Sequence, residues 1–264
     1  VMAQIKAVLI DLSGTLHVGT TAIPGAVSAL SKLRKSGLKV KFVTNTTKDS
    51  KDTLFKKLQI LGFDIKKHEI WSSLAAARKL VDTKKLRPLL LLSDSAKEDF
   101  KGVETNDPNA VVVGLAPSKF DYGNLNKAFR LLMKDGKETE LYAIHKGRYM
   151  KSSDGGLSMG PGGFVSALEY ASGKTATVIG KPSSSFFLEA LNFQGEEKDE
   201  TISISATNAI MIGDDIRDDV GGAQISGLKG ILVKTGKYRN NDETRYDVSP
   251  WCVAQDFPDA VDKI

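Results

Sequence analysis

The sequence predicts an α/β protein built on a parallel sheet, and two observations support this. Short apolar runs alternate along the chain with segments whose apolar residues recur at helical spacing, and polar side chains directly follow several of these runs. Such alternation is typical of a parallel sheet with helices on both faces. The runs predicted as strands of the main sheet are KAVLI (6–10), KVKFV (39–43), ATVIG (176–180), NAIMI (208–212) and GILVK (230–234).

A helix is predicted between the first two strands. It begins after Pro24, ends at Gly37, and places Val27, Leu30 and Leu33 on one face. Strand, helix and strand then form one βαβ unit of a Rossmann-like sheet. Nearer the C-terminus, the polar segment GEEKDETISISATN (195–208) is predicted as a surface loop.

The middle of the chain repeats the same alternation with its own strands and helices. We therefore predict an α/β cap domain over residues 85–174, inserted into a Rossmann-like core domain made of residues 1–84 and 175–264. The elements predicted within the cap are strands PLLLL (88–92), AVVVG (110–114) and ELYAI (140–144), and helices around 122–134 and 162–172.

Composition excludes several classes of protein. The 264 residues are 41% hydrophobic and 26% charged, which is enough apolar material for a sizeable core. Cys252 is the one cysteine, so no intrachain disulfide forms, and the N-terminus shows no signal-peptide pattern. A net charge of +5, spread among acidic residues, is a poor match to a nucleic-acid surface. We expect a cytoplasmic protein that binds neither nucleic acid nor membrane.

Polar side chains follow four of the predicted main-sheet strands. The first strand is followed by Asp11, the second by Thr44 and Asn45, the third by Lys181, and the fourth by Asp214 and Asp215. In an open parallel sheet the ligand crevice lies at the carboxyl ends of the strands, so these groups should converge there. Any one of them alone could be a helix cap, but four together are hard to explain as capping.

The chemistry of this set suits a phosphoryl group beside a metal ion. Repulsion within a cluster of five aspartates would raise their pKa values unless a cation were present. Carboxylate oxygens suit Mg²⁺, which proteins usually bind together with a substrate phosphate. Lys181 adds a positive charge, Thr44 and Asn45 add neutral donors, and aspartate is an established phosphoryl acceptor, so Asp11 is the predicted nucleophile. The five aspartates are Asp11, Asp214, Asp215, Asp218 and Asp219.

Four ordered motifs resemble those of the haloacid dehalogenase (HAD) superfamily, capped subgroup IIA. They are VLIDLSGTLH (8–17), FVTNTT (42–47), VIGKP (178–182) and IMIGDDIRDDVGGA (210–223). The resemblance implies a phosphatase with a HAD-like core, an α/β cap and a Mg²⁺ cofactor. A dehalogenase of the same fold is disfavoured, because that chemistry needs no Mg²⁺ and the last motif is acidic.

The resemblance also implies roles for individual residues. Asp11 would be both nucleophile and metal ligand, with the backbone carbonyl of Ser13 and the carboxylate of Asp214 as further ligands. Either Asp215 or Asp219 would support the metal, whereas Asp218 is expected to be structural. The residues that would bind the phosphoryl group are Asp11, Leu12, Ser13, Thr44, Asn45 and Lys181.

Ser13 departs from the common phosphatase pattern, which has a second aspartate at this position. That aspartate acts as general acid and then base, and a serine hydroxyl cannot shuttle protons near neutral pH. The lost assistance is worth about 10² to 10⁴ in rate. Either the enzyme acts on leaving groups that need no proton, or the chain is a catalytically weak or silent phosphate-binding scaffold. The suitable substrates are pyrophosphate, phosphoramidates such as phosphohistidine or phospholysine, and acyl or aryl phosphates.

A basic segment lies in the predicted cap. AIHKGRY (143–149) places His145, Lys146 and Arg148 after a strand, where they could contact the substrate, although a solvated loop is an equal alternative. The expected partner is a small phosphorylated molecule or phosphoamino acid. Relatives of this subgroup often pair through their caps, which makes a homodimer an expectation by analogy.

Overall fold

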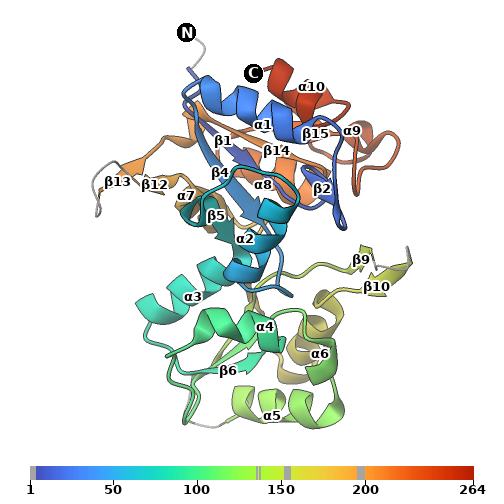
Figure 1. Cartoon of the computed structure of the whole chain (residues 1–264). Coiled ribbons are helices and arrows are strands. Elements are labelled where there is room, and N and C mark those ends of the chain that lie inside the picture. The colour runs from blue at the N-terminus through green and yellow to red at the C-terminus, as the bar shows by residue number, and fades with distance from the viewer. Residues whose placement is uncertain (1–3, 135, 137, 152–155, 195–199) are drawn as a thin grey trace. The chain divides into compact units, whose positions relative to one another are not determined.

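The computed structural model describes residues 4–134, 136, 138–151, 156–194 and 200–264. The chain divides into two compact units (Figure 1). Unit 1 consists of Val1–Thr44, Thr53–Trp71 and Lys181–Ile264, and unit 2 consists of Asn45–Asp52 and Ser72–Gly180. Among the described residues, no helix combines the length and the apolar character needed to cross a membrane.

Unit 1 contains a six-stranded sheet in the order β16-β15-β14-β1-β4-β5. The pairings of β1 with β4 and β14, and of β15 with β14 and β16, are parallel. Four of these strands match predicted runs, and β5 and β16 add one strand at each edge. The strand bounds are β1 Ala7–Ile10, β4 Lys39–Thr44, β5 Ile70–Ser72, β14 Ala209–Gly213, β15 Lys229–Val233 and β16 Cys252–Ala254.

Helices of unit 1 pack apolar side chains onto the sheet. Leu30 of α1 and Phe257 of α10 share one core with Val8 and Phe42 of the strands, and Figure 1 shows α1 and α10 side by side. Val27, which was predicted on one face of this helix with Leu30 and Leu33, is 36% exposed. The buried residues of α1 are Ala26, Ala29, Leu30 and Leu33. The helices are α1 Ala26–Lys35, α2 Lys51–Ile60, α7 Ser184–Ala190, α8 Gly222–Ile225, α9 Asp242–Arg245 and α10 Phe257–Asp262.

Short elements complete unit 1. The predicted loop 195–208 was wrong in part, because Thr201–Ser203 forms strand β13, which pairs antiparallel with β12 (Asn192–Gln194). Its residues 195–199 lie outside the described part of the chain. A second small pair joins β2 and β3, and the remaining elements are single turns. Their bounds are β2 His17–Val18, β3 Thr21–Ala22, η1 Lys67–Glu69, η4 Ala206–Asn208 and a π-helical turn, η5, Ile216–Gly221.

Unit 2 is a four-stranded sheet, in the order β11-β8-β7-β6, with helices on both faces. Alternate strand residues point to opposite faces, so Val112 packs with Leu74 of α3 while Val111 packs with Ala128 of α5. The strands are β6 Pro88–Leu91, β7 Ala110–Val113, β8 Glu140–Ala143 and β11 Thr177–Val178, with a separate hairpin of β9 Tyr149–Lys151 and β10 Leu157–Met159. The helical segments are α3 Ser73–Thr83, α4 Asp94–Lys97, η2 Glu98–Phe100, η3 Pro117–Lys119, α5 Tyr122–Leu132 and α6 Gly162–Ser172.

One predicted strand belongs to the other sheet. The run 176–180 was expected in the main sheet, but its paired residues, β11, extend the sheet of unit 2 by pairing parallel with β8. Thr177 lies opposite Tyr142, and the chain enters unit 1 only at Lys181. Unit 2 also includes residues 45–52 and 72–84, which lie outside the expected cap boundaries of 85 and 174.

Candidate active site

Three buried carboxylates meet at the carboxyl end of the sheet of unit 1. Asp11 follows β1, Asp214 follows β14, and Asp219 lies in the π-helical turn after Asp214. One carboxylate oxygen from each lies within 4.8 Å of the others. The two strands are parallel neighbours with Ile10 opposite Ile212, so the residues that follow them emerge side by side.

Lys181 lies between two of these carboxylates. Its Nζ is 2.6 Å from Oδ1 of Asp11 and 2.7 Å from Oδ1 of Asp219, and it also donates to the backbone carbonyl of Val43 at 3.3 Å. Only 4% of the Lys181 side chain is exposed. Burial alone would lower the pKa of Lys181, but the nearby charges of Asp11 and Asp219 raise it overall. The ammonium group is therefore permanently charged and fixed against the predicted nucleophile.

The remaining aspartates carry more negative charge than this lysine balances. Burial, followed by the charges of Asp11 and Asp219, holds the pKa of Asp214 well above its ordinary value. Burial is also the main reason why the pKa of Asp219 rises to about 7 and that of Asp218 to about 6. Carboxyl groups with raised pKa values gain from an added cation, and an all-oxygen donor set suits Mg²⁺. The residues present therefore fit a divalent metal.

Two predicted metal-supporting residues also have protein partners. Oδ1 of Asp215 accepts the backbone N–H groups of Arg217 and Asp218 at 3.0 and 3.1 Å, so it caps the π-helical turn. Burial would raise the pKa of Asp215, but the charge of Lys237 and these N–H groups lower it overall. Oδ2 of Asp219 accepts the N–H of Asp215 at 3.1 Å. The carboxylates of Asp215 and Asp219 thus accept hydrogen bonds that stabilise the start of the π-helical turn.

The residues after Asp11 lie in two environments. Leu12 is buried in the apolar core, so only its backbone remains for contact with a ligand. Ser13 is exposed. Its neighbour Gly14 donates its N–H to the carbonyl of His17 at 2.7 Å, which closes the turn. The structure thus leaves Ser13 accessible after the end of β1.

Thr44 and Asn45, the predicted hydrogen-bond donors of the second motif, belong to different units. Thr44 is the last residue of β4 in unit 1, and 4% of it is exposed. Asn45 is the first residue of unit 2, where its side-chain oxygen lies against Gly180 so closely that a Cβ on that glycine would overlap it. The chain therefore changes units between these two neighbouring donors.

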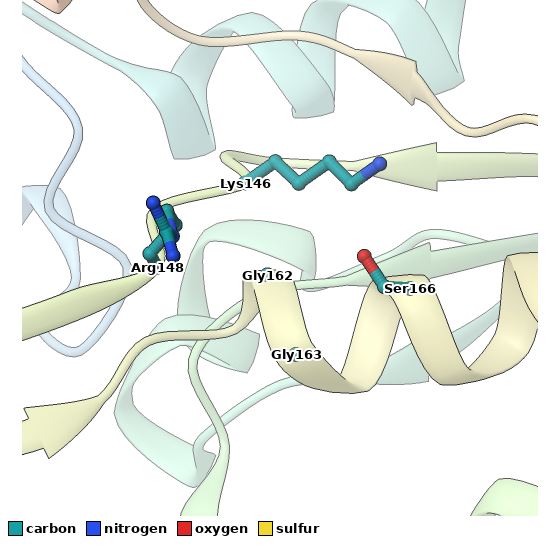
Figure 2. A pocket seen from close by; sticks show the side chains of 5 residues that line it. All are labelled: Lys146, Arg148, Gly162, Gly163 and Ser166. Carbon is teal, nitrogen blue, oxygen red and sulfur yellow. The ribbon is translucent and has the colours of Figure 1, made fainter.

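The basic segment of unit 2 forms part of a pocket of about 400 Å³. Figure 2 shows Lys146 and Arg148 together with the first turn of α6. The Nζ of Lys146 is 2.5 Å from a carboxylate oxygen of Glu169. The side chain of His145 instead bonds within unit 2, to the Thr47 hydroxyl at 3.4 Å and the N–H of Gly147 at 3.2 Å. The pocket is lined by Lys146, Arg148, Gly162, Gly163 and Ser166.

Sequence reasoning missed a group of residues that contact this site. The turn after β15 brings the backbone N–H of Lys237 to 2.6 Å from Oδ2 of Asp214, and the hydroxyl of Thr235 to 2.5 Å from the carbonyl of Gly14. The signal was present, because the polar residues KTGK (234–237) end the predicted strand 230–234. The rule used for four other strands would have found them if it had been applied to this one.

Comparisons with known proteins agree with the motifs. The family described as haloacid dehalogenase-like hydrolase matches residues 8–106, and one described as HAD-hydrolase-like matches residues 178–260. Haloacid dehalogenase-like hydrolase domain-containing protein 2 of Homo sapiens is 56% identical, over 98% of this chain and 96% of that protein. Phospholysine phosphohistidine inorganic pyrophosphate phosphatase of Homo sapiens is 41% identical, over 99% of this chain and 94% of that protein.

A solved structure shows the same similarity. Glycerol phosphate phosphatase from Mycobacterium tuberculosis, in complex with magnesium, is 26% identical with a TM-score of 0.80, over 97% of this chain and 78% of that one. The chain belongs to the haloacid dehalogenase-like hydrolases, and it is a phosphatase of that family.

Proposed function

We propose that the chain is a Mg²⁺-dependent phosphohydrolase that works through an aspartyl-phosphate intermediate on Asp11. The observation that supports this best is the position of the Asp11 carboxylate, which is buried, paired with Lys181 at 2.6 Å, and within 4.8 Å of Asp214 and Asp219. A carboxylate held in this way is oriented for attack and needs no proton removed before it acts.

The reaction proceeds in two displacements. An oxygen of Asp11 attacks phosphorus, the bond from phosphorus to the leaving group breaks, and the leaving group departs with the electron pair. Water then hydrolyses the acyl phosphate, which frees phosphate and restores the carboxylate. Lys181, Thr44 and Asn45 bind the phosphoryl oxygens throughout, and the ion pair with Asp219 keeps the Lys181 ammonium in place.

The metal completes the charge balance of the site. When bound, Mg²⁺ neutralises charge on the phosphoryl oxygens and the surrounding carboxylates. Asp11, the Ser13 carbonyl and Asp214 would hold it, and Asp215 or Asp219 would support it. The raised pKa of Asp214 supports this assignment, because a carboxyl group with a raised pKa gains from an adjacent cation.

Ser13 defines the substrate class. Since it cannot protonate a leaving group, the enzyme favours substrates whose leaving group departs without a proton. These include pyrophosphate, phosphoramidates such as phosphohistidine or phospholysine, and acyl or aryl phosphates. The name of the relative that is 41% identical, a phospholysine, phosphohistidine and inorganic pyrophosphate phosphatase, supports the same class.

Unit 2 supplies the cap in this proposal, with residues 85–174 as its main part. His145, Lys146 and Arg148, from the basic segment AIHKGRY of the cap, are the residues proposed to contact the substrate. Pairing of two copies through the cap is supported by β10, where Leu157 and Met159 are 68% and 62% exposed. The single cysteine supports a cytoplasmic setting.

A series of substrates with increasingly basic leaving groups tests the proposal. We expect Mg²⁺-dependent phosphate release from pyrophosphate, a phosphoramidate and p-nitrophenyl phosphate, slow release from an alkyl phosphate, and none in excess chelator. Ser13→Asp should speed the alkyl ester by up to about 10²-fold, because it adds a proton shuttle. The matched control is Ser13→Asn, because asparagine has nearly the same shape as aspartate but no acidic group. This variant should not hydrolyse the alkyl ester faster than the wild type.

Two outcomes contradict the proposal in different ways. Rates that do not depend on leaving-group basicity, with no gain in Ser13→Asp, would show that Ser13 does not define the substrate class. Phosphate binding without hydrolysis of any substrate, by the wild type or by Ser13→Asp, would favour the alternative that Ser13 also suggests, a silent phosphate-binding scaffold.

A further inference from the structure

The turn after β15 contacts the acidic site through three consecutive residues, Thr235, Gly236 and Lys237. Strand β15 is the parallel neighbour of β14 in the sheet, with Leu232 opposite Gly213. The turn that follows β15 therefore emerges beside Asp214, which follows β14. None of the three residues belongs to the four motifs that identify the family.

Two contacts of this turn fix the metal-facing groups in position. The backbone N–H of Lys237 donates to Oδ2 of Asp214 at 2.6 Å. The hydroxyl of Thr235 donates to the carbonyl of Gly14 at 2.5 Å, one residue after the Ser13 carbonyl. The turn therefore connects the carboxylate at the end of β14 to the chain that follows the nucleophile.

Close packing leaves the Asp214 carboxylate little freedom to move. Gly14 has a φ of +101° and Gly236 a φ of +57°, and a Cβ on either residue would overlap Oδ2 of Asp214. Both positions need glycine, for the backbone conformation and for the space. The carboxylate is thus enclosed between two backbone segments, and one of its oxygens is already hydrogen-bonded.

The side chain of Lys237 acts in a different way from its backbone. Its Nζ is 3.4 Å from Oδ2 of Asp215, and 61% of the side chain is exposed. A positive charge at this edge partly balances the aspartates while the metal is absent, and it repels a metal cation that approaches them.

We infer that Thr235, Gly236 and Lys237 form a positioning element that sets the metal affinity of the site, with contributions of opposite sign. The Thr235 hydroxyl strengthens metal binding because it holds the Gly14 turn in place before the metal arrives. The Lys237 ammonium weakens metal binding because it competes with the cation for the same negative charge. This inference rests on the proposed metal site.

Calorimetric titration of the full chain with Mg²⁺ tests the inference without using activity. Thr235→Val removes one hydrogen bond and should weaken Mg²⁺ binding by about two- to tenfold. Lys237→Met keeps the backbone N–H and removes the charge, so it should tighten Mg²⁺ binding by about three- to tenfold at low ionic strength, and by less in high salt.

Matched controls come from the same region of the chain. Lys234→Met removes a lysine whose Nζ pairs with Glu243 at 3.2 Å. Thr244→Val removes a hydroxyl that donates to the backbone carbonyl of Asn241 at 3.1 Å. Neither control should change the Mg²⁺ affinity, although either can lower the melting temperature.

The outcomes separate this inference from the proposed function. Shifts of opposite sign in Thr235→Val and Lys237→Met, with unchanged controls, support the positioning role. The positioning role is overturned if the wild type binds Mg²⁺ but neither variant changes the Mg²⁺ affinity, or if both change it in the same direction. The proposed metal site would then remain intact. A wild-type chain that takes up no Mg²⁺ overturns both.

Discussion

Replacing Lys181 by methionine should destabilise the metal-free protein strongly. The Lys181 side chain is 4% exposed, and its ammonium contacts the carboxylates of Asp11 and Asp219 at 2.6 and 2.7 Å. The variant therefore leaves two buried carboxylates without their counter-charge. Breaking a buried ion pair by removing one partner costs about 3 to 5 kcal/mol. At about 2 to 4 °C per kcal/mol for a protein of this size class, the melting temperature should fall by roughly 6 to 20 °C.

The structure offers a matched control in Lys41, a second buried lysine, which lies in β4 of unit 1. Its Nζ donates to the backbone carbonyl of Asn192 and lies 4.6 Å from the ring centroid of Phe193. Lys41→Met therefore removes a lysine of the same size together with its hydrogen bond to a neutral carbonyl. Loss of such a hydrogen bond costs about 0.5 to 1.5 kcal/mol, which corresponds to roughly 1 to 6 °C.

Thermal melting of both variants in excess chelator, at pH 5 and pH 8, distinguishes charge from packing. The pKa of Asp219 is about 7 with Lys181 present, and loss of the ammonium raises it further. At pH 5 the Asp219 carboxyl of Lys181→Met is protonated, so the destabilisation caused by this variant should shrink. Equal destabilisation by the two variants, or no change with pH, would refute the electrostatic argument.

Two further outcomes are expected. Asp11→Asn should abolish phosphate release while circular dichroism shows the fold retained, because the change is nearly isosteric and removes the nucleophile; substantial residual turnover would point to another nucleophile. In the metal-free protein the pKa of Asp219 is raised to about 7, so the native state holds a proton that the unfolded state has released. The free energy of unfolding contributed by Asp219 therefore falls as pH rises from about 4 to about 7. Urea denaturation in chelator should show this fall as the difference between the wild type and Asp219→Asn. The opposing contribution of His17, whose pKa is lowered mainly by burial, cancels in that comparison. If the unfolding free energy of the wild type relative to Asp219→Asn rises with pH instead, the raised pKa of Asp219 is contradicted.

The main sheet could be predicted because buried parallel strands are continuous apolar runs. Strands β1, β4, β14 and β15 lie where such runs were found. Strands β5 and β16 were missed because three residues each, Ile70–Ser72 and Cys252–Ala254, give too little periodic signal. Strand β11 was found but given to the wrong sheet, because an apolar run does not encode its neighbour. Its pairing with β8 depends on the tertiary structure.

The candidate site shows the same limit at the level of side chains. The strand-end rule found Asp11 and Asp214, since parallel strands bring their carboxyl ends to one edge. It also named Lys181, but for the wrong reason, because the strand before Lys181 belongs to the sheet of unit 2. It could not show that Lys181 bridges two carboxylates, because that depends on where the π-helical turn places Asp219. The ion pair between Lys146 and Glu169 joins different elements, so it could not be predicted from the sequence either.

The parallel pairing of β1 with β14 has a consequence for how ligands control the amount of folded protein. Asp11 and Asp214 are distant in sequence and become neighbours only when these strands pair, so an unfolded chain has no corresponding acidic site. A cation that binds there acts on the native state alone and shifts the folding equilibrium by mass action. At a free Mg²⁺ concentration one hundred times its Kd, the gain is roughly 2.7 kcal/mol. The proposed Mg²⁺ cofactor would thus also act as a folding ligand, and its supply would help set how much of the chain is folded at any moment.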